Sequence, residues 1–494
     1  MGRVDISYRR IFVIAGPVLV TNFSYTMMGV IDTMMVGRLG VAALAAVGLA
    51  NMVAFSILSF FWGLMTGVNT LTAQAVGARD REAIGRVFFQ GLYLALASGL
   101  VILATMPLVK SILGWVDPSP EVARIAAEYM NVRLFGGLSV VLMWAGDNFY
   151  RGLGRTTVMM WCGMVQLVLN CGFNWVLIFG KLGAPAMGAA GAALGTVLAQ
   201  LAIALFLLGS IVAAGPIRRE FLPGLSFTAP RRRAHAAAAQ TVDRGAEVWR
   251  LRPALFGGLV RLSVPIGVQT CLEMGGVTVF TAVVARIGDA ELAATNAVIQ
   301  AWSVAFMGAL ALAVGATTLV GQCVGAGELA ETRIVVRRVT WLGYALTVVV
   351  GAVYVLAPGR LMALFVSADE LPRLLPFARP LFAVVVACLV FDLKFNILSG
   401  ALRGAGDTTY SMLVNIASAW LLFVPALLLV TPRWGLVGAW SCFILHVFVM
   451  ASLLELRVRG SRWLRSPVLR GGEAPQRAGP VPSDSALAEE GDAA

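Results

Sequence analysis

The heptapeptide RGLGRTT at residues 151–157 recurs 252 positions later as RGAGDTT at residues 403–409. Gly188 and Gly191 recur as Gly435 and Gly438 at an offset of 247. An offset of 248 matches a third region, pairing Pro17, Arg38, Gly40, Leu44, Gly67, Gln74 and Gly77 with Pro265, Arg286, Gly288, Leu292, Gly315, Gln322 and Gly325. Chance similarity between apolar segments would not preserve glycine, proline, glutamine and arginine at a nearly fixed offset. The sequence is therefore a duplication of one unit.

The amino-acid composition indicates that the repeated unit lies in a membrane. Of the 494 residues, 59% are hydrophobic and 13% are charged, against roughly 45–50% and about 25% in soluble domains. A bilayer core about 30 Å thick is crossed by about 20 apolar residues in a helix, and apolar stretches of that length recur along the chain. This composition excludes a soluble enzyme and predicts an all-α integral membrane protein, for which we expect no enzymatic activity.

Apolar windows between charged, proline or glycine breaks predict twelve spans in two sets of six. They lie near 11–36, 47–75, 87–109, 124–148, 158–179, 189–213, 259–285, 295–322, 339–365, 374–400, 410–430 and 436–456. The predicted organisation is an amino-terminal lobe (1–213), a basic linker (214–257), a carboxyl-terminal lobe (258–458) and a largely disordered tail (459–494). Because each lobe has an even number of spans, the two are parallel repeats, an architecture of transporters.

The net charge is +12. The basic residues that produce it are distributed along the chain as the positive-inside rule predicts. With both termini in the cytoplasm, most of the basic residues fall on the cytoplasmic side, and Arg124, Arg133 and Lys394 are assigned to the spans. We therefore expect membrane lipids as partners and no nucleic acid. The six cysteines lie in apolar stretches without a C-x-x-C pair, so we expect neither a disulfide framework nor a zinc site.

Three acidic residues stand out within predicted spans, Asp32 in the first, Glu273 in the seventh and Asp392 in the tenth. An acid inside a bilayer costs several kcal/mol unless it faces a cavity or a partner. We interpret all three as ion-coupling residues, with structural pairing as the alternative. Lys394 makes that alternative serious for Asp392, although positions i and i+2 do not share a helix face. The repeat gives none of the acids an acidic counterpart, aligning them with Phe280, Tyr25 and Val140 respectively.

Polar residues of the fifth and sixth spans extend the first of these sites. Asn170 and Asn174 are four residues apart and share one helix face, and Thr196 follows on the next span. Amide and hydroxyl oxygens beside the Asp32 carboxylate suit a small cation such as Na⁺, or they tune an acid that carries a proton. Hydrogen bonding between helices is the structural alternative.

With these motifs the chain resembles the multidrug and toxic compound extrusion (MATE) family and its NorM-like bacterial members. The resemblance rests on VIDTMMVGRLG at 30–40, QAVGA at 74–78, Pro265 with Glu273, and LRGAGDTT at 402–409, and it extends over about residues 8–458. It implies a V-shaped pair of six-helix lobes in the bacterial cytoplasmic (inner) membrane. It also implies alternating access, with export of amphipathic organic cations or drugs in exchange for H⁺ or Na⁺.

The resemblance assigns Asp32, Asn170, Asn174 and Thr196 to the amino-lobe coupling site and Glu273 and Asp392 to the carboxyl lobe. We expect a monomer that needs no cofactor beyond the coupling ion. One departure stands one turn before Asp392, where such members can carry a tyrosine and this chain has Cys388. Two alternative functions stay open. One is a flippase for a lipid-linked precursor, and the other is a non-transporting membrane scaffold.

Overall fold

The fold is all-α throughout the part of the chain that the structure describes. The computed structural model describes residues 3–116, 118–213, 248–362 and 371–465, and these contain no strand. The first repeat forms α1 (Tyr8–Gly37), α2 (Val41–Gly77), α3 (Arg81–Ala104), α4 (Val109–Val116), α5 (Pro120–Phe135), α6 (Gly137–Gly152), α7 (Thr156–Phe179) and α8 (Gly188–Ala213). The second forms α11 (Pro253–Ala285), α12 (Asp289–Ala326), α13 (Leu329–Leu356), α14 (Pro358–Met362), α15 (Leu371–Ala405), α16 (Thr408–Ile416), the π-helix η2 (Ala417–Phe423) and α17 (Val424–Arg459). Short 3₁₀ turns cover Met106–Leu108 and Arg462–Arg465.

Ten of the described helical segments are long and apolar enough to cross a membrane, or eleven when the bent pair α5 and α6 counts as one span. The last segment, Thr408–Arg459, has 52 residues, which at 1.5 Å per residue is far longer than one bilayer crossing. Its backbone leaves helical geometry at Gly435, between the two predicted spans 410–430 and 436–456. Division at Gly435 gives the twelve crossings expected from the sequence.

Two details differ from the prediction. The span near 124–148 is two helices, α5 and α6, bent by 47° at Gly136. The predicted linker 214–257 ends too late, because α11 already begins at Pro253. Of the remaining linker, residues 214–247 lie outside the described residues, as do residues 466–494 of the predicted tail.

The described chain forms two compact units. The amino unit comprises residues 20–267 and the carboxyl unit comprises residues 3–19 with 268–465. The divisions therefore lie inside α1 and α11, two residues after Pro17 and Pro265, which are equivalent positions of the repeat. The boundaries between the compact units therefore lie inside helices, whereas the sequence predicted that the linker 214–257 separates the lobes.

The repeat motif RGxG ends a helix that packs closely on its neighbour in each unit. A Cβ on Gly152 would lie 2.8 Å from the carbonyl oxygen of Asn69, and one on Gly404 would lie 2.5 Å from that of Thr317. The second glycine of each copy, Gly154 or Gly406, has a positive φ of 68° or 93°, a conformation open mainly to glycine. The motif recurs because both units make the same close approach followed by the same turn.

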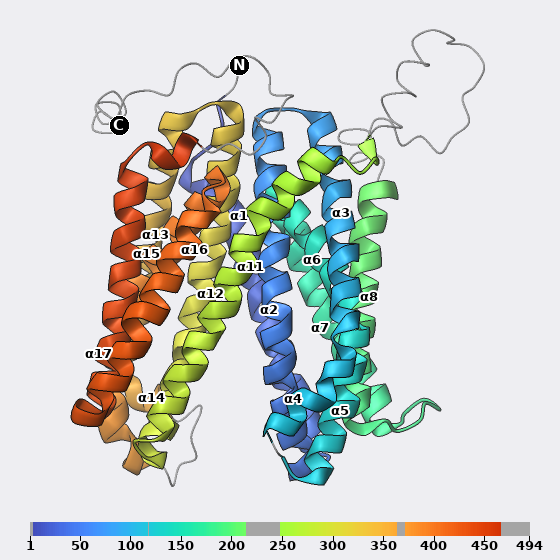
Figure 1. The fold of residues 1–494 in the computed structure, drawn as a ribbon, viewed down its shortest axis with the longest axis vertical. Helices are drawn as coiled ribbons and strands as arrows, with labels where there is room; N and C mark the ends of the chain where they lie inside the picture. Colours follow the sequence, from blue (N-terminus) through green and yellow to red (C-terminus); the bar gives the residue numbers. More distant parts are fainter. Residues whose placement is uncertain (1–2, 117, 214–247, 363–370, 466–494) are drawn as a thin grey trace. The chain divides into compact units, whose positions relative to one another are not determined.

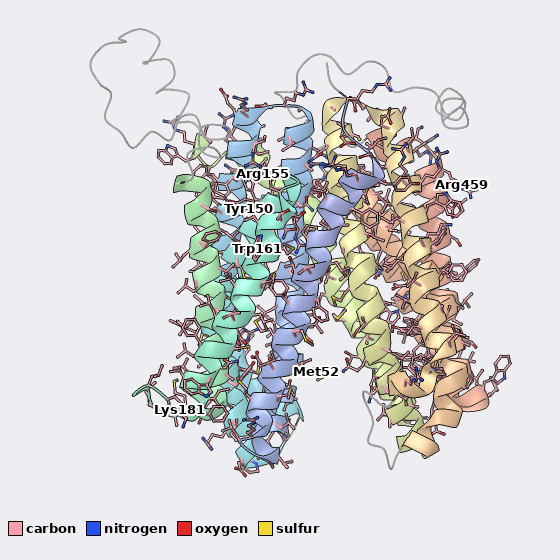
Figure 2. All side chains as sticks on the ribbon, turned by 180° about the vertical axis from the view of Figure 1, so that it is seen from behind. Met52, Tyr150, Arg155, Trp161, Lys181 and Arg459 are labelled. Carbon is pink, nitrogen blue, oxygen red and sulfur yellow. The ribbon has the colours of Figure 1, made fainter. Side chains whose placement is uncertain are left out.

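In the amino unit α6 packs against α2, α3, α7 and α8, and in the carboxyl unit α15 packs against α12, α13 and α17 (Figure 1). Large apolar side chains also cover the outside of the helices. Trp161 on α7 is 58% exposed (Figure 2), and Trp341 on α13 is 63% exposed. An exposed apolar belt of this kind fits lipid as the surrounding solvent.

Candidate functional site

The amino unit brings Asp32 together with the three polar residues expected beside it. The Nδ2 of Asn174 donates to Asp32 Oδ1 at 2.5 Å, and the Thr196 hydroxyl donates to Asp32 Oδ2 at 3.4 Å. Asn170 Nδ2 donates to Thr196 Oγ1 at 3.1 Å, and Asn174 Nδ2 lies 3.3 Å from Asn170 Oδ1. Asn170 and Asn174 are fully buried, whereas Asp32 is half-buried. One half-buried carboxylate thus receives hydrogen bonds from α7 and α8.

Small residues on α8 make this cluster geometrically feasible. A Cβ on Gly191 would lie 2.5 Å from the carbonyl oxygen of Leu177, and one on Gly195 would lie 2.2 Å from Asn174 Oδ1. Any larger residue would push α8 away from α7. The close approach brings Thr196 within reach of Asn170.

Two residues of α5, Tyr129 and Arg133, lie beside the cluster. The sequence had indicated Arg133 as a charge inside a span, but it had not indicated Tyr129. Arg133 attracts the Asp32 carboxylate electrostatically, and its Nη1 donates to Gln200 Oε1 at 3.4 Å. Tyr129, one turn earlier, is buried, and its hydroxyl donates to Asn51 Oδ1 at 2.9 Å. The i, i+4 spacing of Tyr129 and Arg133 was the signal in the sequence.

Glu273 lies at the centre of a polar network in the carboxyl unit. Its Oε1 accepts from Gln269 Nε2 at 3.0 Å and from Asn415 Nδ2 at 2.7 Å. Ser411 donates to Gln269 Oε1 at 3.2 Å and lies 2.9 Å from the Ser399 hydroxyl. Arg403, one turn beyond Ser399, attracts the Glu273 carboxylate electrostatically. The sequence had indicated Glu273 alone, although the spacing of Gln269 and Glu273 places both on one helix face.

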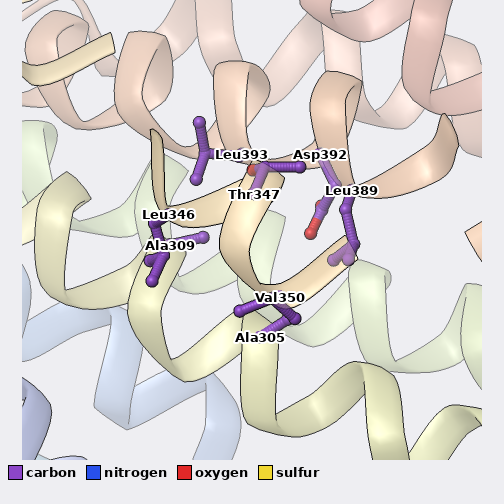
Figure 3. A pocket seen from close by; sticks show the side chains of 8 residues that line it. All are labelled: Ala305, Ala309, Leu346, Thr347, Val350, Leu389, Asp392 and Leu393. Atoms are coloured by element: carbon purple, nitrogen blue, oxygen red, sulfur yellow. The ribbon is translucent and has the colours of Figure 1, made fainter. Parts of the chain in front are cut away.

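Asp392 is 6% exposed on α15 of the same unit. Its Oδ1 accepts from Asn396 Nδ2 at 3.1 Å, and its buried Oδ2 has no hydrogen-bond partner among the described residues. The side chain lines a small pocket together with Thr347, Leu389 and neighbouring apolar residues (Figure 3). Asp392 and Glu273 belong to the same compact unit. Cys388, one turn earlier, is fully buried.

Lys394, the candidate structural partner of Asp392, pairs elsewhere. Its Nζ forms an ion pair with Glu455 on α17. A buried ion pair, which the sequence reasoning missed, joins Asp147 and Arg151 in α6 with Nη2 and Oδ2 2.7 Å apart. Its signal was again the i, i+4 spacing of opposite charges.

The two units use equivalent positions differently. Asp32 and Thr196 correspond in the repeat to Phe280 and Phe443, whose ring centroids are 5.8 Å apart in the carboxyl unit. Phe423 and Trp440 complete this aromatic contact with Phe280, at 6.2 and 5.4 Å. The polar site of one unit is therefore an apolar contact in the other.

No group of three or more histidine, cysteine, aspartate or glutamate side chains suited to a metal ion occurs within the described ranges. The expectation of Na⁺ at Asp32, Asn170, Asn174 and Thr196 depends instead on one carboxylate with neutral oxygens, and it stays a prediction.

A family model described as MatE matches residues 17–176 and 265–428. The chain belongs to the MatE family. The two matched segments begin at Pro17 and Pro265, equivalent positions of the repeat, so each half of the chain contains one matched segment.

Relatives match over almost the whole chain. A probable multidrug resistance protein NorM of Rhizobium meliloti is 32% identical over 430 residues, which cover 86% of this chain and 87% of the relative. A multidrug resistance protein MdtK of Edwardsiella ictaluri is 26% identical over 464 residues, covering 92% and 95%. This MATE transporter is therefore NorM-like.

Solved structures share the fold. A MATE protein crystallised in complex with MaL6 superimposes with a TM-score of 0.78 at 20% identity, covering 92% of this chain and 97% of that one. An outward-facing multidrug resistance MATE transporter of the MOP superfamily gives 0.76 at 20% identity, covering 92% and 96%. This agreement confirms the all-α membrane fold predicted from the sequence.

Proposed function

We propose that this MATE transporter exports amphipathic organic cations or drugs in exchange for H⁺ or Na⁺ by alternating access. The observation that carries the proposal is the Asp32 cluster, a half-buried carboxylate inside a span that Asn174 and Thr196 contact directly, with Asn170 hydrogen-bonded to both of them. Relatives named as multidrug resistance proteins support the substrate class.

The exchange follows from the energetics of a charge in a membrane protein. An ionised carboxylate away from bulk water is stabilised by a bound cation, by a proton or by hydrogen-bond donors. When Asp32 binds the coupling ion, its negative charge is neutralised and an organic cation loses its electrostatic partner. Release of the ion restores the charge that attracts the next organic cation. The Asp32 carboxylate therefore binds the organic cation and the coupling ion alternately.

Glu273 and Asp392 form the second coupling region in this proposal. The two carboxylates act on each other electrostatically, and like charges in a buried region resist joint ionisation. One of them therefore binds the coupling ion more readily than an isolated acid would. The unpartnered Oδ2 of Asp392 makes Asp392 the acid that has an oxygen free for that ion.

We place the protein in the bacterial inner membrane with both termini in the cytoplasm, and we propose that it acts as a monomer. Both ends of the described chain meet on α13, where Arg338 donates to the Ile6 carbonyl at 3.0 Å and Arg333 donates to the Arg459 carbonyl at 2.9 Å. The two ends therefore lie at the same end of the carboxyl unit, as cytoplasmic termini require.

The test is efflux of a panel of cationic dyes and drugs from a pump-deficient bacterial host, with Na⁺ and pH gradients imposed separately. Asp32→Asn keeps the size of the side chain but removes its charge and one of its two acceptor oxygens, and we expect export to fall to the level of the host carrying an empty vector. The matched control is Glu128→Gln, because Glu128 is an exposed acid of the same unit paired with Arg124. Export by Asp32→Asn at the wild-type rate would show that Asp32 is not a coupling residue.

A further inference from the structure

The pocket beside Asp392 is almost entirely apolar. Eight side chains from α12, α13 and α15 line it (Figure 3), and six of them are alanine, valine or leucine. The two polar ones are Asp392 and Thr347, each 6% exposed. Asn396 occupies Asp392 Oδ1, whereas the buried Oδ2 has no hydrogen-bond partner among the described residues. An orphaned buried oxygen of this kind indicates an occupant such as a water molecule, an ion or a proton.

Close packing of the helices limits what fits into this pocket. Its free volume is about 10 Å³, which is room for no more than about one water molecule. A Cβ on Gly308 of α12 would lie 2.7 Å from Leu346 Cδ2, and one on Gly343 of α13 would lie 2.4 Å from Leu393 Cδ2. Both leucines line the pocket, so these contacts hold its walls together. A cation that keeps part of its hydration shell does not fit.

The pocket is also poor in oxygen ligands. Hard cations such as Na⁺ are bound by several oxygen atoms at once, and the lining side chains offer only the Asp392 carboxylate and the Thr347 hydroxyl. The lining residues lie inside the continuous helices α12, α13 and α15, where backbone carbonyls are engaged in the helix. Transporters that bind Na⁺ within the membrane draw on the carbonyls of unwound helices. A proton, in contrast, needs a single carboxylate oxygen.

Asp392 is the one acidic or basic residue among the eight that line the pocket. Between Glu291 and Glu328, α12 carries no acidic or basic residue. Titratable side chains on the surrounding helices make other contacts: Glu273 with Gln269 and Asn415, Tyr344 with Trp341, Tyr354 with the Ala301 carbonyl, Lys394 with Glu455, and His446 with Ser418. Cys388, one turn before Asp392, is fully buried, and Arg360 of α14 is exposed. A proton that enters the pocket therefore binds to Asp392.

We propose that Asp392 takes up its coupling ion as a proton, and that Thr347 is a further residue of this site, hydrogen-bonded to the protonated carboxyl group directly or through one water molecule. This inference rests on the proposed function, because it takes Asp392 as a residue that binds the coupling ion, and it selects H⁺ over Na⁺ at this acid. The proton binds to Oδ2 and forms a neutral carboxyl group. That group is far less costly in apolar surroundings than a carboxylate, and its O–H supplies the hydrogen bond that the orphaned oxygen lacks.

The experiment records the infrared carbonyl band of protonated carboxyl groups. The purified full-length protein is titrated with acid in detergent, in NaCl and in KCl at equal ionic strength, and the Asp392 band is the difference between the wild type and Asp392→Asn. We expect a band that grows as the pH is lowered and that is the same in both salts. The matched control is Glu455→Gln, because Glu455 is a partly exposed acid of the same unit paired with Lys394 and Arg459. This variant should keep the Asp392 band.

The role of Thr347 is tested by the frequency of the same band. Thr347→Val keeps the shape of the side chain and removes its hydroxyl group, so the carboxyl group loses a hydrogen-bond partner. We expect the Asp392 band to shift to higher frequency in Thr347→Val and to return toward the wild-type frequency in Thr347→Ser. An unchanged frequency in a folded Thr347→Val would remove Thr347 from the site.

Two outcomes would overturn the assignment of the proton. One is loss of the Asp392 band in NaCl but not in KCl at the same pH, which would show that Na⁺ displaces the proton. The other is the absence of any Asp392 band over the whole pH range in which the protein stays folded. Both measurements identify the ion without drug or gradient. Drug export by Asp392→Asn at the wild-type rate would instead contradict the coupling role of Asp392 in the proposed function, so the two failures are distinguishable.

Discussion

Ser263 packs against Gly67 so closely that a Cβ on Gly67 would lie 2.0 Å from Ser263 Oγ. The equivalent pair in the other repeat is Ala15 and Gly315, where the same construction gives 3.7 Å to Ala15 Cβ. The beginning of α11 therefore packs on α2 in the amino unit, and the beginning of α1 packs on α12 in the carboxyl unit. Each unit is completed by a helix end from the other half of the sequence, as its core residues confirm.

We expect Gly67→Ala to destabilise the protein by about 1–3 kcal/mol, because the added methyl group overpacks the contact with Ser263. Ser263→Ala in the same chain should recover part of the loss, since it removes the nearest atom. Thermal unfolding in detergent measures both. Gly48→Ala is the control on the same helix, where a Cβ meets nothing within 4 Å. If Gly67→Ala were as stable as Gly48→Ala, this packing of α11 on α2 would be wrong.

Asp147→Asn should destabilise the amino unit by about 3–5 kcal/mol, because it leaves the buried Arg151 guanidinium without its counter-charge. Both side chains are less than 10% exposed. Glu128→Gln removes the exposed partner of Arg124 and should cost less than about 1 kcal/mol. Chemical unfolding curves of the two variants provide the comparison, and equal effects would contradict the buried character of the Asp147 pair.

The partner of Lys394 is tested by two double-mutant cycles. The cycle of Lys394→Met with Glu455→Gln should give a coupling energy of about 1 kcal/mol, as expected for a partly exposed pair. The cycle of Lys394→Met with Asp392→Asn should give about 0.5 kcal/mol or less. Free energies of unfolding supply both numbers. A coupling energy between Lys394 and Asp392 larger than that between Lys394 and Glu455 would show that Lys394 is the structural partner of Asp392.

His446 contributes to packing in the carboxyl unit. Its Nδ1 lies 2.8 Å from Ser418 Oγ, and its ring stacks on Phe423 with centroids 5.0 Å apart. His446→Gln should lower the stability by about 1–2 kcal/mol through lost stacking and an altered hydrogen bond. Drug export and its dependence on external pH should stay as in the wild type. A changed pH profile with a normal amount of folded protein would identify His446 as a proton carrier.

Local regularities in the sequence predicted much of the fold and part of the site. Apolar length predicted the helices, and the break at Gly435 falls where two spans were expected. Spacing on a single helix predicted that Asn170 and Asn174 act together. The bend at Gly136 was not predicted, because it depends on the fit of Gly136 against Val197 on another helix. Composition alone does not encode that contact.

From the sequence we predicted a duplicated, multi-span membrane protein and singled out three of the acids inside its spans. Those features depend on hydropathy, periodicity and a constant offset, which are properties of the chain alone. The partners of the charges became visible only in three dimensions: Lys394 pairs with Glu455, and Arg133 donates to Gln200. It also decided that Phe280 and Phe443 form an apolar contact where the other unit has its carboxylate. The physical reason is that electrostatic and hydrogen-bond energies depend on distances between helices, and those distances are fixed by packing at positions such as Gly67, Gly136 and Gly195.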